Sequence, residues 1–138
     1  MRLGTAATDW FDLAVEASPV NARQLRVRFQ EWLQTLGAPV ALVDNLTLAV
    51  YEALANVVEH AYPPDCAHPL MRLRARVDHR QVLITISDHG RWRAPASGPG
   101  YRGRGLAMMR SLTTALHLHR SAEGTTVRMR APLRCSGR

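Results

Sequence analysis

The spacing of apolar residues along the chain predicts three helices and five strands. Apolar residues recur every three to four positions in residues 19–36, 39–62 and 106–114, as is typical of amphipathic helices. Ser18 supplies an N-cap before the first of these helices, and Gly37 marks its end. Helices with one apolar face need a second layer against which to bury it.

Five other segments alternate apolar and polar residues, which is the pattern of a strand with one buried face. Strands that alternate so cleanly imply a sheet covered on one face only. The order strand, helix, helix, strand, strand, helix, strand, strand therefore predicts a two-layer α/β sandwich. The predicted strands are residues 11–17, 71–78, 82–88, 116–119 and 125–131.

The length of 138 residues fits a single domain, with a core at about residues 10–132 and frayed termini. A formal net charge of +7 usually suggests nucleic acid as a partner. All eighteen basic residues are arginine, however, and they are spread along the chain without a polybasic block. A solvated basic surface is the simpler interpretation, and we expect no direct contact with nucleic acid.

The sequence also indicates a location. No apolar run approaches the ~20 residues of a membrane span, and the N-terminus has no apolar signal core. Cys66 and Cys135 are the only cysteines, so a disulfide framework is not expected. These features favour a cytoplasmic protein that does not associate with a membrane.

Three polar side chains interrupt the apolar stripe of the second helix. Glu52, Asn56 and His60 are four residues apart, so they lie along one helix face. Burying an unsatisfied polar group costs roughly 1–3 kcal/mol, so these groups need partners. Neighbouring backbone or a polar ligand such as a hydrated metal ion would both serve, and the helix alone leaves the two open. For His60 a helix-end role, favoured by the helix dipole, is the simpler interpretation.

Two more polar residues occupy inward positions at strand ends. Asp88 continues the inward register of its strand, and Thr125 opens the last strand with the same parity. Asp88 is also a common residue type at the start of a turn, which would explain it without any function. A carboxylate that points toward the core at a strand end is nonetheless a candidate acceptor for a ligand donor.

Residues 90–105 are rich in glycine and proline, so no regular element can span them. We expect a lid at residues 91–104. Glycines before the helix that begins at Leu106 would leave backbone N–H groups free to bind phosphate. The segment matches neither the dinucleotide-binding fingerprint nor the Walker A loop.

Four motifs occur in a specific order: E-A-L-A-N-V-V-E-H-A-Y, S-D-H-G-R-W, G-R-G-L-A-M-M and G-T-T-V. Together they resemble the nucleotide-binding boxes of the GHKL ATPase superfamily. The N-x-x-x-H-A-Y form and the small size are most similar to the anti-sigma factor serine-protein kinases. The resemblance implies a histidine kinase-like ATPase fold, with a mixed, mostly antiparallel five-stranded sheet and three helices on one face, and ATP and Mg²⁺ as ligands.

The resemblance also implies a role for each matching residue. Asn56 would coordinate Mg²⁺, and Glu52 would act as general base. Asp88 would accept a hydrogen bond from the adenine amino group, Gly90 would let the base approach closely, and Thr125 would support Asp88. The turn that cradles the phosphates would consist of Gly103, Arg104, Gly105 and Leu106.

By the same resemblance, the protein would be an ATP-dependent serine/threonine kinase that phosphorylates an anti-anti-sigma antagonist. It would sequester a sigma factor in a partner-switching pathway and form a homodimer. Two alternatives stay open: a nucleotide-gated regulatory binding module without efficient phosphotransfer, and the kinase-like domain of a larger signalling protein. His89 and the proline- and arginine-rich lid depart from the family pattern, which affects the expected catalytic rate more than ATP binding.

Overall fold

Eight elements follow one another in the order that the sequence predicts. The computed structural model describes residues 8–91 and 104–133, and at residues 104 and 105 it describes the backbone alone. The strands are β1 (Trp10–Glu16), β2 (Leu70–Asp78), β3 (Gln81–Asp88), β4 (Ala115–Ser121) and β5 (Gly124–Pro132). The helices are α1 (Pro19–Thr35), α2 (Val40–His60) and α3 (Arg104–Leu112).

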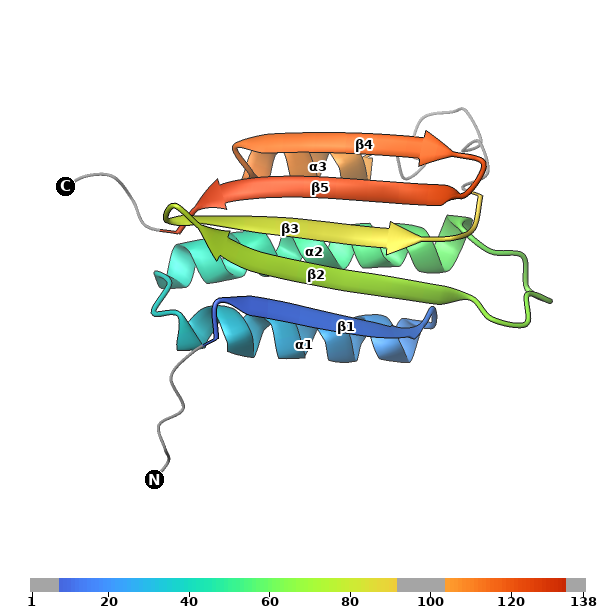
Figure 1. Ribbon diagram of the computed structural model, residues 1–138, viewed down its shortest axis with the longest axis horizontal. Helices are drawn as coiled ribbons and strands as arrows, with labels where there is room; N and C mark the ends of the chain where they lie inside the picture. The colour runs from blue at the N-terminus through green and yellow to red at the C-terminus, as the bar shows by residue number, and fades with distance from the viewer. Residues whose placement is uncertain (1–7, 92–103, 134–138) are drawn as a thin grey trace, which may run out of the picture.

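The five strands form one sheet in the order β1-β2-β3-β5-β4, and each neighbouring pair is antiparallel. The three helices lie side by side on the same face of this sheet, and the opposite face is uncovered (Figure 1). α2 is the middle helix and lies behind the central strands, where both of its sides can pack. The predicted two-layer α/β sandwich is confirmed, with antiparallel pairing between the described strands.

The helix ends follow local chemistry. Ser18 is the N-cap of α1, and its Oγ accepts a hydrogen bond from the Asn21 N–H group (3.1 Å). α3 spans Arg104–Leu112 rather than the predicted 106–114. It ends early because the Thr114 N–H group donates to the Arg130 carbonyl (2.8 Å) and so belongs to the sheet side of the connection.

The core lies between the sheet and the helices. Phe29 on α1 is fully buried, and its ring packs edge-on against Phe11 of β1 with centroids 6.0 Å apart. α2 is the one described helix that is long and apolar enough to cross a membrane by length and composition. Half of its most apolar window is buried inside the fold, as expected for the central helix of a folded domain.

Candidate functional site

Segments that are far apart in the sequence meet at one end of the sheet. β3 ends there at Asp88, β5 begins there at Gly124, and α2 ends there at His60 (Figure 1). α3 begins at the same end. The residues singled out from the sequence belong to these segments, except Gly103 and the part of the predicted lid at 92–103, which lie outside the described residues.

Asp88 and Thr125 are buried neighbours across the pairing of β3 with β5. They are 4% and 3% exposed and are direct partners in the antiparallel register. Asp88 Oδ1 accepts hydrogen bonds from the backbone N–H groups of Gly90 (2.9 Å) and Thr125 (3.4 Å). The predicted inward register of both residues is confirmed. Backbone N–H groups therefore orient the Asp88 carboxylate, and Thr125 provides one of them.

Two glycines allow the backbone to close around Asp88. A Cβ atom on Gly90 would lie 2.1 Å from the Ala61 carbonyl oxygen, at the end of α2. The next residue, Arg91, donates its N–H group to the same oxygen (2.8 Å). A Cβ atom on Gly124 would lie 1.9 Å from the Asp88 carbonyl oxygen, and Gly124 has a φ of +141°. Both positions thus require glycine so that neighbouring backbone can approach closely.

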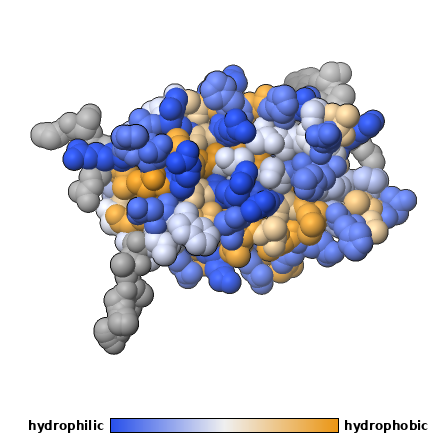
Figure 2. Space-filling view, in the orientation of Figure 1, coloured by the Kyte–Doolittle hydropathy of each residue, from blue (hydrophilic) through white to orange (hydrophobic). Residues whose placement is uncertain are grey.

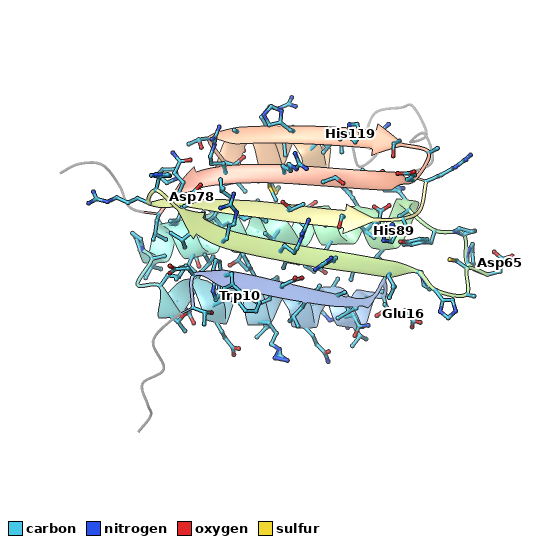
Figure 3. All side chains as sticks on the ribbon, in the orientation of Figure 1. Trp10, Glu16, Asp65, Asp78, His89 and His119 are labelled. Atoms are coloured by element: carbon cyan, nitrogen blue, oxygen red, sulfur yellow. The ribbon has the colours of Figure 1, made fainter. Side chains whose placement is uncertain are left out.

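Tyr62 ties three segments together at this end. Its hydroxyl accepts a hydrogen bond from the His89 N–H group (2.8 Å) and donates one to the Leu70 carbonyl (2.5 Å). Burial raises the pKa of the Tyr62 phenol above its usual value, although the bond from His89 acts in the opposite direction. Figure 3 shows His89 at the end of β3, on the side of the molecule where β2 begins. Tyr62 therefore fixes the turn after Asp88 relative to the end of α2.

Sequence reasoning assigned no role to Tyr62, although this residue ends the motif N-x-x-x-H-A-Y. The signal available was its place directly after α2 and before the pair Pro63-Pro64, where a large polar aromatic cannot continue the helix and must find another partner. In the sequence, Gly124 is singled out only as the first residue of the motif G-T-T-V. Its contact with Asp88 depends on how β5 approaches β3, which the local sequence does not encode.

The three polar residues that share one face of α2 (Glu52, Asn56 and His60) are all at least half-buried. Asn56 is buried, with 3% of its surface exposed, while Glu52 and His60 are half-buried. His60 is the last residue of α2, and its Nε2 lies 3.7 Å from Glu59 Oε1. A buried amide needs hydrogen-bond or metal partners, so Asn56 is a candidate for binding a polar ligand.

α3 brings the predicted phosphate turn to the same end. It packs along α2, and Leu106 in its first turn packs against the core. The helix begins at Arg104, so the backbone of Arg104 and Gly105 supplies N–H groups that have no partner within the helix. The roles of Gly103, Arg104, Gly105 and Leu106 toward phosphate stay a prediction.

The donor set favours a cation that is held mainly by its ligand. No group of three or more His, Cys, Asp or Glu side chains in the described part of the chain could hold a metal ion. What the site offers is the oxygen of Asn56, one helical turn from the carboxylate of Glu52. Mg²⁺ accepts this kind of site, because it commonly takes one protein oxygen together with phosphates and water. The residues present therefore fit a magnesium–nucleotide complex.

Residues 15–131 match the family described as the histidine kinase-like ATPase domain. The chain belongs to this family. Its match extends from β1 into β5, so it includes each segment that meets at the end of the sheet. Binding of ATP, usually with Mg²⁺, follows from membership, and the anti-sigma kinase-like resemblance found in the sequence is supported.

A solved structure gives the same picture of this ATPase domain. The present chain is similar to the crystal structure of the RsbU and RsbW domains of Rv1364c from Mycobacterium tuberculosis, with a TM-score of 0.76 and 25% sequence identity. The match covers 91% of this chain but 33% of the other. The ATPase domain thus spans about a third of that chain, and its fold and kinase-like character are what the comparison supports.

Proposed function

We propose that this ATPase domain binds Mg-ATP at the end of the sheet and transfers its γ-phosphate to a serine or threonine of an antagonist protein. The observation that carries the proposal is the burial of two polar groups that belong to different elements. Asn56 on α2 and Asp88 on β3 are 3% and 4% exposed. Polar groups buried to this degree are expected to bind a ligand. Membership of the histidine kinase-like ATPase family indicates that this ligand is ATP.

Asn56 and Asp88 would recognise different parts of the nucleotide. The Asn56 oxygen is a hard donor and would complete the coordination of Mg²⁺. The Asp88 carboxylate, already held through Oδ1 by backbone donors, would accept a hydrogen bond from the adenine amino group. Gly90 would let the turn after β3 close against the end of α2, and Thr125 would keep the carboxylate in place.

Glu52 would act as the general base. It lies four residues before Asn56 on α2, which is about 6 Å along the helix. Its carboxylate would take the proton of the acceptor hydroxyl while that oxygen forms a bond to the γ-phosphorus. The bond from the γ-phosphorus to its bridging oxygen breaks, and ADP leaves with the negative charge. Bound Mg²⁺ would supply neutralisation of the phosphate charge.

The biological role proposed for this activity is partner switching. The ATPase domain would hold a sigma factor in the cytoplasm as a homodimer, and phosphorylation of an anti-anti-sigma antagonist would decide which partner it holds. The resemblance of the four motifs to anti-sigma factor kinases and the similarity to a structure with an RsbW domain support this role. That structure also supports the alternative that such a domain works within a larger signalling protein, because the present chain spans a third of it.

Thermal stabilisation tests nucleotide binding. ATP with Mg²⁺ should raise the Tm of the wild type, since a ligand at about 100 times its Kd adds about 2.7 kcal/mol. Asn56→Ala should lose the part of the shift that depends on Mg²⁺, and Asp88→Asn should lose most of the shift. Asn45→Ala is the matched control, because Asn45 is exposed on the same helix. Equal shifts in all four proteins would contradict the proposed site.

Phosphotransfer tests the reaction. The wild type, labelled ATP and a candidate antagonist protein should yield labelled antagonist. Glu52→Gln should keep the thermal shift and lose transfer by about 10²-fold or more, as expected for a general base. If Asn56→Ala transfers phosphate as fast as the wild type, the proposed mechanism is wrong. Tight Mg-ATP binding without transfer in the wild type would instead favour a nucleotide-gated binding module.

A further inference from the structure

The uncovered face of the sheet carries a regular array of arginines. Outward residues of β2 and β5 alternate with the buried core residues of the same strands. In the register, Arg74 is paired with Thr85 and Thr85 with Arg128, while Arg76 is paired with Leu83 and Leu83 with Arg130. We call these four arginines (Arg74, Arg76, Arg128 and Arg130) the arginine cradle.

The arginine cradle borders a groove with an uncharged floor. The groove has a volume of about 540 Å³, and its lining includes the four arginines together with Leu83, Thr85 and Trp10. β2 and β5 lie on either side of β3, so the two rows of arginines are about 10 Å apart. Within each row the two arginines are about 7 Å apart. Figure 2 shows this face, where strongly hydrophilic side chains lie between apolar patches.

Most of the cradle has no acidic partner in the part of the chain that the structure describes. Arg74, Arg128 and Arg130 take part in no ion pair there, and Arg76 has a contact of 3.6 Å with Asp78. Asp12, the acidic residue nearest to Arg74 on this face, is already bound by both Nε and Nη2 of Arg72 (2.8 and 2.6 Å). That pair shows the bidentate geometry in which this face binds a carboxylate.

We propose that the arginine cradle docks an acidic segment of a protein partner, with carboxylates spaced about 7 Å apart so that they meet successive arginines of a row. Charge complementarity excludes the other protein occupants. A second copy would bring a second arginine cradle and like-charge repulsion. The segments outside the described residues (1–7, 92–103 and 134–138) contain no Asp or Glu, so they cannot supply the charge.

The floor of the groove argues against nucleic acid. Single strands bind to basic sheets through aromatic side chains on which the bases stack. The floor between the arginine rows consists of Leu83 and Thr85. Trp10, which is 62% exposed, is the one Trp, Tyr or Phe that points outward from the described strands, and it lies on the edge strand β1 (Figure 3). An uncharged floor of Leu83 and Thr85 between guanidinium groups fits a peptide with apolar and acidic side chains better.

The test uses a fluorescent peptide of about 12 residues that alternates Glu and Ala, whose carboxylates recur every ~7 Å when extended. Fluorescence anisotropy should show binding by the wild type, and a Gln-Ala peptide should not bind. Arg74→Glu with Arg128→Glu should raise the Kd about tenfold or more. The matched control is Arg23→Glu with Arg28→Glu, which makes the same change in net charge on exposed positions of α1 and should change Kd less than about twofold.

Each of four outcomes would overturn the proposal. Equal loss of binding in both double variants would mean that only bulk charge matters. Tighter binding of a single-stranded DNA of equal charge, lost in Arg74→Glu with Arg128→Glu, would mean a nucleic-acid surface. A wild-type dimer in sedimentation that this double variant dissociates would mean a self-association surface. Should the charge-reversed variant fail to fold, Arg74→Gln with Arg128→Gln should raise the Kd about threefold, and no change would refute the cradle. No nucleotide is needed, so failure here leaves the proposed ATP site untouched.

Discussion

Among substitutions that add one methyl group at the site, Gly124→Ala should lower the free energy of unfolding most. Gly124 has a φ of +141°, a conformation that is nearly restricted to glycine and costs another residue about 1–3 kcal/mol. The new Cβ atom would also lie 1.9 Å from the Asp88 carbonyl oxygen. Because that oxygen is backbone, the contact can be relieved only by moving β3 away from β5, at a further cost of about 1–3 kcal/mol.

The sum, about 2–6 kcal/mol, is a large share of the 5–15 kcal/mol that stabilises a typical domain. For a chain of this length it corresponds to a fall in Tm of at least about 6 °C. Urea denaturation followed by far-UV circular dichroism measures the free energy of unfolding, and the midpoint should fall while the slope m stays unchanged.

Gly37→Ala is the matched control. Gly37 also has a positive φ (+75°), but a Cβ atom there would have nothing within 4 Å. Its substitution should therefore cost only the backbone strain, about 1–2 kcal/mol. The difference between the two variants isolates the contact with Asp88. If Gly124→Ala is no less stable than Gly37→Ala, β5 does not approach Asp88 as described and the reasoning is refuted.

Two further outcomes concern the core and the site. Phe29→Ala should lower the free energy of unfolding by about 3–5 kcal/mol, because the ring is fully buried between Phe11 and Trp32. Val20 lies on the same helix and is 52% exposed. Val20→Ala should therefore change the free energy of unfolding by no more than about 0.5 kcal/mol in the same urea titration. The raised pKa of the Tyr62 phenol means that the folded chain keeps this proton at a pH where the unfolded chain has lost it. Its contribution to stability is full below about pH 10 and is lost as the pH rises through the folded pKa. Tyr62→Phe should therefore show a smaller alkaline decline of the free energy of unfolding, and an identical decline would contradict this assignment.

Periodicity was enough to predict the parts of the site that lie within single elements. The inward register of Asp88 and Thr125 follows from a period of two, and the burial of Asn56 follows from a period of 3.6. Both repeats are properties of one strand or helix, so they are visible before the fold is known. The N-cap at Ser18 was also visible in the sequence, because it depends only on the residue type next to the start of the helix.

The contacts between elements were not predictable in this way. The need for glycine at Gly90 and Gly124 arises where the end of α2 and the start of β5 approach β3. The bonds of Tyr62 to Leu70 and His89 depend on that same approach. The early end of α3 depends on a hydrogen bond from Thr114 to β5. Each of these joins residues whose separation in space is set by the whole chain rather than by neighbours in sequence.

Among the described strands β5 is synthesised last, yet it lies inside the sheet, between β3 and β4. A nascent chain that has not yet released β5 from the ribosome leaves one edge of β3 unpaired, and Asp88 lacks the N–H group of Thr125. Such an intermediate exposes a template for wrong strand pairing, which is where chaperones act. The wall around Asp88 forms only after β5 has paired with β3, so the nucleotide binding proposed at this wall would report on the completed sheet during translation.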